Sequence, residues 1–544
     1  MNIKWSSART LPFWLALAAL VGAAYLLVGA VRYGVTGFPL DDAWIHQTYA
    51  RNLATTGQWA FVPGQVSAGS TAPLWSLLLS LGYRLGIPYT VWAYGLGAVA
   101  LGLTGWTVSW LGTMLYPDQR RASYLAGILC IGEWHLVWAA VSGMETVLFI
   151  WLSVMTVGLW QLSNIKHQIP NSEWQVGNPK KRGGTEQARR FDVRDLKFDN
   201  RDFIFFLLGF VGGLLALTRP EGLLLVALIG LATGWQRRHA PRRWLVSWAA
   251  MGLGLMLTLA PYLIFHYSTT GQPFPNTLYA KQQEYHDMLA LYPVWRRWLT
   301  MASVTLVGGQ VLLLPGFFLA VGRAITGHSS SPARSAILLI TAWWFAHLAL
   351  YALRLPVTYQ HGRYQMPVIP FFILIGTAGT GQLLRLVTQP SVNRILARTM
   401  IASLGLVFLG FLGIGARAYA TDLGFIQGEM VATARWLVKN TPEHSQIAVH
   451  DIGAVGYFAN RPLLDLAGLV TPQVIPFITN ESLLIEFIQS EGADYVIFFP
   501  DWSAPYQRMA ADSRLELVHT TGFQWTLDQG RANMAVYRVD APVP

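Results

Sequence analysis

Residues 11–45 read LPFWLALAALVGAAYLLVGAVRYGVTGFPLDDAWI, and this stretch decides the fold class. Its first part, residues 11–31, is about 20 residues long without a charge, which is enough to cross a bilayer as a helix. Two adjacent aspartates, Asp41 and Asp42, follow soon after it. The sequence therefore predicts a carboxylate pair at a membrane surface, where the first transmembrane helix ends, and such a pair suits chemistry on a lipid-linked substrate.

The composition of the whole chain agrees with that first segment. Of its 544 residues, 53% are hydrophobic and 12% are charged, which is too apolar for a soluble enzyme. The first segment is too long for a cleavable signal peptide, and more membrane-like sequence follows it. The single cysteine, Cys130, can form no intrachain disulfide and says little about the redox compartment. The net charge of +11 is concentrated in loops, so we expect no nucleic-acid partner.

Apolar spans recur over residues 1–420, the part of the chain we expect to form the membrane domain. The window rule predicts about eleven transmembrane helices. They lie near residues 11–31, 91–115, 122–141, 145–162, 203–217, 222–235, 244–266, 298–322, 335–353, 364–387 and 400–419. With the N-terminus in the cytoplasm, basic loops such as those of Arg120, Arg237 and Arg394 all fall on one side, which the positive-inside rule makes the cytoplasmic one.

Three features of the loops complete this topology. The apolar stretch 72–85 is short for a span, so we expect it to lie at the outer surface as an amphipathic or re-entrant helix within a first outer loop of residues 38–90. The polar stretch 163–202 is expected to be a flexible cytoplasmic loop. Pro220 and Gly222 suit a tight turn between two short helices on the outer side.

After about residue 421 the composition changes, and no further span is predicted. Strand-like runs at 446–450, 494–499, 515–519 and 534–539 alternate with helical patterns at 428–439 and 483–489. Residues 421–544 therefore predict a soluble α/β domain of about 120 residues. The span count places it outside the cytoplasm.

The acid pair has two interpretations. An aspartate after Pro39-Leu40 is typical of a helix N-cap, and a second acid in the first turn suits the helix dipole. Capping does not exclude catalysis, because Asp42 and His46 are four residues apart and share a helical face, with Arg51 further along the same helix. A carboxylate there could take a proton from a hydroxyl group or hold a metal ion against a phosphate.

A second group of residues is basic, and all of it is expected on the outer side. These residues lie in short loops, where their positive charges could offset that of a phosphate leaving group: Arg219, Lys281, His361 and Arg363. Alternatively, each of these side chains snorkels to the lipid headgroups. Glu145 starts a helix at its outer end, where it could cap that helix or bind a hydroxyl group. No metalloprotease, CxxC, phosphate-loop or nucleophile-elbow motif is present in a credible context.

Short strings spread over most of the chain resemble those of one known group of enzymes. They are Asp41-Asp42-Ala43-Trp44-Ile45, Gly69-Ser70-Thr71-Ala72-Pro73-Leu74-Trp75, Ser142-Gly143-Met144-Glu145, Thr218-Arg219-Pro220-Glu221-Gly222, Pro275-Asn276-Thr277-Leu278-Tyr279-Ala280-Lys281 and, in the tail domain, Gly453-Ala454-Val455-Gly456-Tyr457 with Asp465-Leu466-Ala467-Gly468-Leu469. They resemble the GT-C membrane glycosyltransferases, and most closely the terminal arabinofuranosyltransferases of mycobacterial cell walls and their bacterial relatives.

The resemblance implies a polytopic membrane enzyme of the bacterial plasma membrane with an extracytoplasmic tail domain. It implies a polyprenyl-phosphate sugar donor, a glycan or lipid acceptor, and a catalytic centre at Asp41 and Asp42. A base at one of these two, with Asp41 preferred, would give single displacement with inversion. By the same resemblance Glu221 and Tyr279 join the substrate-binding candidates. His46 replaces the small residue usual in the family, so its contact with substrate or metal stays open, as do the sugar and the need for a divalent cation.

Two other classes of protein remain as alternatives. A lipid or solute transporter would place its ionisable residues near the bilayer midplane and show repeated halves. A non-catalytic membrane scaffold that presents the tail domain would leave Asp41 and Asp42 in open water. A pocket that contains the acid pair beside the basic residues would favour the enzyme over both.

Overall fold

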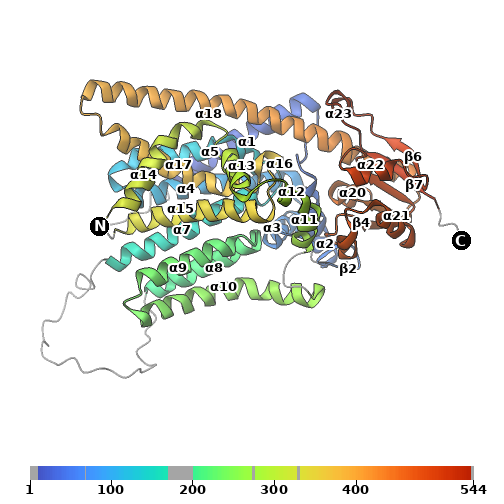
Figure 1. Ribbon diagram of the computed structural model, residues 1–544, viewed down its shortest axis with the longest axis horizontal. Helices are drawn as coiled ribbons and strands as arrows, with labels where there is room; N and C mark the ends of the chain where they lie inside the picture. The colour runs from blue at the N-terminus through green and yellow to red at the C-terminus, as the bar shows by residue number, and fades with distance from the viewer. Residues whose placement is uncertain (1–9, 68, 169–199, 272–275, 328–330, 541–544) are drawn as a thin grey trace.

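A computed structural model describes residues 10–67, 69–168, 200–271, 276–327 and 331–540. Long helices form a bundle, and a small α/β domain packs against one end of it (Figure 1). In the described part of the chain, eight helices are long and apolar enough to cross a membrane, as expected of a multi-pass membrane protein. They are α1 (Leu11–Tyr33), α4 (Tyr89–Leu115), α7 (Thr146–Gln168), α10 (Pro241–Thr270), η5 with α14 (Gly309–Leu313, Leu314–Thr326), α15 (Pro332–Arg354), α16 to α17 (Tyr359–Gly362, Ile369–Leu384) and α18 (Pro390–Ile426).

The three other predicted spans exist as shorter or broken helices. The paired helices α8 (Asn200–Thr218) and α9 (Gly222–Gln236) are separated by the predicted turn, and α8 packs against α10. The predicted span 122–141 breaks into α5 (Arg120–Ile131) and α6 (Trp134–Ala140). It breaks there because Glu133 accepts a hydrogen bond from the Leu136 N–H and so caps a new helix.

The predicted span 298–322 is also interrupted. It consists of α13 (Val294–Val304) and then η5 and α14, with Trp134 donating to the carbonyl of Val307 between them. The two interruptions therefore face each other, which is how non-helical backbone is accommodated inside a bundle. The number of helices that actually cross remains a prediction.

Short elements cover the end of the bundle beside the tail domain (Figure 1). After α1 come α2 (Asp41–Thr56), a hairpin of β1 (Ala60–Val62) and β2 (Gln65–Val66), and α3 (Pro73–Arg84). The 12 residues of α3 span about 18 Å, too little to cross the membrane alone. One face of α3 is buried through Trp75 and Leu79, in agreement with the predicted amphipathic helix. Further short elements are α11 (Asn276–Glu284), α12 (His286–Leu291) and η6 (Met366–Val368).

The tail domain contains a five-stranded mixed sheet in the order β4-β3-β5-β7-β6. The predicted strands are present as β3 (Ile447–Val449), β5 (Tyr495–Phe498), β6 (Leu515–Thr520) and β7 (Ala535–Val539). Strand β4 (Leu463–Asp465) was not predicted, because three residues show no periodicity. Helices α19 (Ala432–Asn440), α20 (Ile452–Phe458), α21 (Glu481–Ser490), α22 (Ala504–Ala510), α23 (Gln524–Asp528) and η8 (Pro472–Phe477) complete the domain.

The domain boundary expected at residue 421 falls inside a continuous helix. Helix α18 runs through one π-helical turn, η7 (Gln427–Val431), directly into α19. Within that turn, Glu429 is fully buried and accepts hydrogen bonds from the tail domain, from Thr521, Thr526, Asn533 and the Met534 N–H. Apolar composition ends near 421, but the helical backbone continues because these hydrogen bonds join it to the domain. Most of the predicted loop 163–202 lies outside the described residues.

Candidate active site

A cavity of about 1160 Å³ lies where the bundle meets the tail domain. Of the eleven side chains singled out in the sequence, nine line it. They are Asp41, Asp42, His46, Glu145, Arg219, Glu221, Lys281, His361 and Arg363. The predicted acid pair and the predicted basic residues therefore meet in one space, and neither aspartate stands in open water.

Asp42 is the more accessible of the two aspartates. Its side chain is 33% exposed, and its Oδ2 accepts a hydrogen bond of 2.6 Å from Nη2 of Arg363. Burial alone would raise the pKa of Asp42, but the charges of Arg363 and Lys281 hold this pKa well below its usual range. The carboxylate is thus ionised at neutral pH and held at the wall of the cavity.

Tyr364 joins the basic residues, although the sequence did not point to it. Its hydroxyl accepts hydrogen bonds from Nζ of Lys281 at 2.8 Å and from Nη2 of Arg363 at 3.0 Å. The guanidinium of Arg219 lies over its ring, 4.8 Å from the centroid. The only signal in the sequence was its position next to Arg363 in a short loop.

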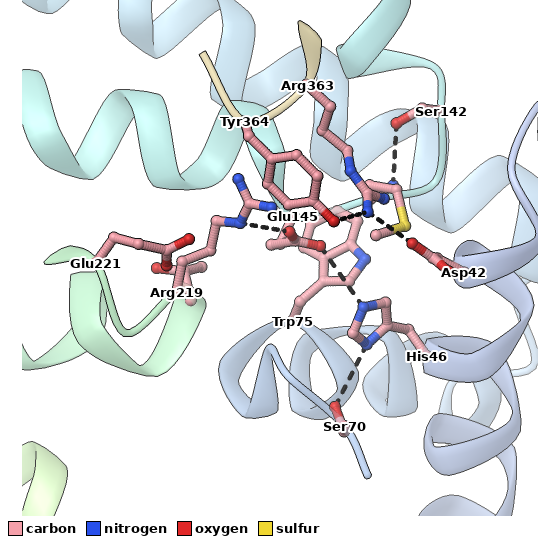
Figure 2. A network of polar contacts seen from close by, with 12 residues as sticks. Asp42, His46, Ser70, Trp75, Ser142, Glu145, Arg219, Glu221, Arg363 and Tyr364 are labelled. Atoms are coloured by element: carbon pink, nitrogen blue, oxygen red, sulfur yellow. Dashed lines mark hydrogen bonds and ion pairs between the residues drawn. The ribbon is translucent and has the colours of Figure 1, made fainter. Parts of the chain in front are cut away.

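The two arginines have unused hydrogen-bond donors. Nε and Nη1 of Arg363 and Nη1 of Arg219 are buried and have no partner among the described residues. Buried polar groups are normally hydrogen-bonded, and a guanidinium presents its donors in a geometry that fits phosphate. Figure 2 shows the guanidinium groups of both arginines close to Tyr364, with Asp42 beside Arg363 and Glu145 beside Arg219. The arrangement suits a bound anion.

His46 and Glu145 form the wall behind this space (Figure 2). Oε1 of Glu145 forms an ion pair with Nε of Arg219 at 3.1 Å. Nε2 of His46 lies 3.6 Å from Oε2 of the same carboxylate. On its other side, Nδ1 of His46 contacts the hydroxyls of Ser76 and Ser70 at 3.0 and 3.3 Å. Burial lowers the pKa of His46, so the imidazole is neutral at pH 7. Arg219 is therefore oriented by Glu145, which in turn lies against His46 and the two serines, so three separate parts of the sequence act together.

Asp41 is bound by the tail domain. Its two carboxylate oxygens accept hydrogen bonds of 2.7 Å from the backbone N–H groups of Gly453 and Ala454, at the start of α20. Burial, together with the nearby Asp451, raises the pKa of Asp41 to about 8 in spite of these two bonds. Both oxygens of Asp41 thus already have partners, whereas Asp42 is the more exposed of the two, and the preference for Asp41 as general base stays a prediction.

The same contact explains the glycine motif after β3. Gly453 and Gly456 lie inside helix α20, which begins at Ile452 directly after the two residues that follow β3. The N–H groups that a phosphate loop would give to a phosphate are given to Asp41. A Cβ atom at Gly453 would lie 2.1 Å from the carbonyl oxygen of Asp41, so only glycine permits this approach.

Two of the predicted site residues lie elsewhere. Arg51 donates to the carbonyl of Tyr457 at 2.8 Å and stacks on that ring, so it fastens α2 to the tail domain instead of facing substrate. The side of α2 that carries Arg51 also carries Trp44, which packs against Tyr457. Tyr279 is half-buried and does not line the cavity. Spacing along a helix placed Arg51 near the site and the family resemblance placed Tyr279 there, but neither could show the contact between α2 and α20.

Glu221 and His361 line the cavity with partners of their own. Glu221 accepts a hydrogen bond from Tyr351, and His361 Nε2 lies 2.7 Å from Asp422 at the end of α18. His361 and the preceding Gln360 both have left-handed backbone conformations, with φ near +57° and +54°. Strain of this kind is held by surrounding structure and is common beside binding sites.

The described residues do not form a good site for a divalent cation. Among them no group of three or more His, Cys, Asp or Glu side chains is arranged to hold a metal ion. Asp41 already accepts two amide hydrogen bonds, and Asp42 already pairs with Arg363. The donor set therefore does not fit the cation left open by the sequence, and we derive no step through one.

Comparison of the chain with known protein sequences and families gives a match that falls on the tail domain. No curated protein sequence matches the chain. A family described as a domain of unknown function, DUF8728, matches residues 415–537. That match begins inside α18 and covers the tail domain, in keeping with the continuous helix that joins the two parts.

Solved structures match nearly the whole chain. ArnT from Cupriavidus metallidurans, bound to undecaprenyl phosphate, is 15% identical with a TM-score of 0.56, and the match covers 95% of this chain and 97% of that chain. The oligosaccharyltransferase of Archaeoglobus fulgidus, tethered to an acceptor peptide, is 14% identical with a TM-score of 0.61, and the match covers 93% and 71%. AftD, an arabinofuranosyltransferase from Mycobacteria, is 15% identical with a TM-score of 0.46, covering 99% and 42%.

These likenesses establish the fold. The chain has the helical fold of ArnT and of the oligosaccharyltransferase with a C-terminal α/β domain, which confirms the expected GT-C-like fold; the number of spans and the side of the tail domain stay predictions. The AftD likeness is too low to carry an argument about the sugar.

Proposed function

We propose that this GT-C chain transfers a sugar from a polyprenyl-phosphate donor to an acceptor hydroxyl group, by a single displacement with inversion. The observation that carries the proposal is the set of unpartnered, buried guanidinium N–H groups of Arg219 and Arg363 beside the ionised Asp42. Arg363 pairs with Asp42 through Nη2 and still has two unpartnered donors for an anion, to which Arg219 adds a third.

The donor phosphate binds at the basic wall. Arg363, Arg219 and Lys281 come from three different segments and converge on Tyr364, which keeps their charges in place before substrate arrives. Negative charge grows on the phosphate as the bond from the anomeric carbon to its oxygen breaks. Preorganised cations stabilise that charge more in the transition state than in the ground state.

Asp42 takes the proton of the acceptor hydroxyl. Before the donor binds, Arg363 and Lys281 make Asp42 a weak base by lowering its pKa. A bound phosphate shares these two cations, so the pKa of Asp42 rises toward the working pH, where a general base is most effective. The acceptor oxygen then forms the new bond at the anomeric carbon, polyprenyl phosphate leaves, and Asp42 holds the proton.

The cavity argues against both alternatives. A transporter would place its ionisable residues near the bilayer midplane, whereas here those of the cavity lie where the bundle meets the tail domain. A scaffold would have no reason to bury Arg363 and Arg219 with free donors around one cavity. The bacterial plasma membrane, with the tail domain outside the cytoplasm, is the location we propose from the distribution of basic loops.

The test uses purified full-length protein and a panel of polyprenyl-phosphate sugars. Mass analysis of released polyprenyl phosphate reports cleavage of the donor. Asp42→Asn is expected to lower transfer by about 100- to 10,000-fold, the range of a general base. Asp118→Asn, an acid outside this cavity, serves as control and keeps full activity. Release of no lipid phosphate from any donor, or full activity of Asp42→Asn, would refute the proposal.

A further inference from the structure

One part of the cavity, which we call the crevice, is lined by residues that follow strands β3 and β5 of the tail domain. Strands β4, β3 and β5 are parallel, and β3 lies between the other two. The chain passes from β4 on one side of β3 to β5 on the other, so the strand order reverses beside β3. In open α/β sheets, ligands bind at such a reversal, outside the carboxyl ends of the strands.

The side chains at this point are those of a polar binding site. His450 and Asp451 follow β3, and Trp502 follows β5. The ring of His450 lies 5.1 Å from that of Trp502, while its nitrogens lie 3.6 Å from Asp451 and 3.8 Å from Glu284 of α11. All four residues line the cavity. The crevice therefore has walls from both the tail domain and the bundle end.

Part of this cluster lacks partners. Oδ2 of Asp451 and the hydroxyl of Tyr506 are buried and have no hydrogen-bond partner among the described residues. Tyr506 is 4% exposed and packs on His450 at 5.5 Å. A buried carboxylate oxygen without a donor is costly, and a hydroxyl group supplied by a ligand would satisfy it.

The charges show which ligand fits. Asp451 and Glu284 accept hydrogen bonds from hydroxyl groups, and because these two carboxylates outnumber the one imidazole of His450, the charge of the cluster disfavours a phosphate. Trp502 is 40% exposed and offers an aromatic face to the C–H face of a sugar ring. The basic wall of Arg219 and Arg363, by contrast, suits an anion. The two regions of one cavity are thus built for different partners.

We propose that the crevice of His450, Asp451, Trp502 and Glu284 binds a sugar ring of the acceptor, so that the acceptor is a neutral carbohydrate. This inference rests on the proposed glycosyl transfer. The crevice is next to the reacting groups. Asp451 lies two residues before Gly453, and the N–H of Gly453 donates a hydrogen bond to Asp41. Asp42 directly follows Asp41 in the chain. An acceptor bound there lies in the same cavity as Asp42, to which it can present a hydroxyl group.

The first test compares kinetics of full-length variants with a carbohydrate acceptor. Trp502→Ala and Asp451→Asn are expected to raise the acceptor KM by about tenfold or more, while the donor KM changes less than about twofold. Trp235→Ala, a surface tryptophan at the end of α9, controls for loss of an aromatic ring. An unchanged acceptor KM in both variants, or transfer only to lipid acceptors without a sugar, would overturn the inference while leaving the transferase intact.

The second test does not need turnover. Saturation-transfer NMR of the wild-type protein with a panel of methyl glycosides (arabinofuranoside, galactofuranoside, mannopyranoside and glucopyranoside) should show contact with at least one of them. The signal should fall at least threefold in Asp451→Asn and stay in Trp235→Ala. No signal from any glycoside, or an equal signal in Asp451→Asn, would overturn the inference even if the protein cleaves no donor.

Discussion

A single methyl group at residue 453 should separate the tail domain from the acid pair. In Gly453→Ala the new Cβ would lie 2.1 Å from the carbonyl oxygen and 2.7 Å from Oδ2 of Asp41. Such contacts are not tolerated below about 3.0 Å, so α20 must withdraw by about 1 Å. The two hydrogen bonds from α20 to Asp41, now 2.7 Å, would lengthen to about 3.7 Å and be lost.

The energetic consequence follows from those two bonds. Each contributes about 1–3 kcal/mol, with the lower end for a protonated carboxyl group and the upper end for an ionised one, so docking loses roughly 2–6 kcal/mol. Alanine would favour α20 itself by up to about 1 kcal/mol, which acts in the opposite direction. Because Asp42 follows Asp41 directly, loss of the two bonds should also displace Asp42. A displacement of Asp42 by about 1 Å should lower the transfer rate on the order of 100-fold.

Two measurements separate undocking from unfolding. Proteolysis near the junction of α18 and α19 should accelerate by at least about tenfold in Gly453→Ala. Cys130 is buried in the bundle. The midpoint temperature at which heating exposes its thiol should be the same in Gly453→Ala as in the wild type, because the bundle core is unchanged. The control is Gly413→Ala, where an added Cβ meets nothing within 4 Å. Equal cleavage rates and equal activity in the two variants would refute the reasoning.

Three further predictions concern charge. Arg363→Lys keeps the charge but loses the bidentate geometry, and should lower kcat by about 100-fold, measured against an Arg385→Lys control at the other end of the bundle; less than a twofold loss would contradict its role. Lys281→Met should raise the donor KM by about 10- to 100-fold and leave the acceptor KM nearly unchanged; the reverse pattern in the same titrations would count against a phosphate contact. Burial lowers the pKa of His450, but the nearby carboxylates of Asp451 and Glu284 raise it to about 9, above its ordinary 6.5. Its stabilisation is therefore complete below pH 6.5 and lost as the pH rises toward 9; thermal melts should show a steeper loss there in wild type than in His450→Gln, and parallel curves would exclude it.

The candidate site shows where spacing along the sequence is informative and where it is not. Asp42 and His46 were found because four residues along a helix bring side chains to one face. Arg219, Lys281 and Arg363 were found because charges in short loops between apolar spans end on one side of a membrane. Tyr364 was missed, since its importance comes from three cations that are distant in sequence and meet at its ring and hydroxyl.

The tail domain gave the largest difference between expectation and structure. Its glycine string was identified, but no pattern in residues 450–457 shows that they begin a helix, α20, or that two amides of this helix would bind Asp41. That contact depends on the docking of a domain more than 400 residues away in sequence. Arg51 was misplaced for the same reason, because Tyr457 approaches it only in the docked domain.

Hydrophobic periodicity and loop charge, which are local properties, determined a helical membrane protein with an acid pair at the end of its first span and an α/β tail. Only the tertiary structure decided which aspartate is accessible. An N–H donor finds its acceptor through space, and the docking of the tail domain gives Asp41 to α20 and leaves Asp42 to the cavity.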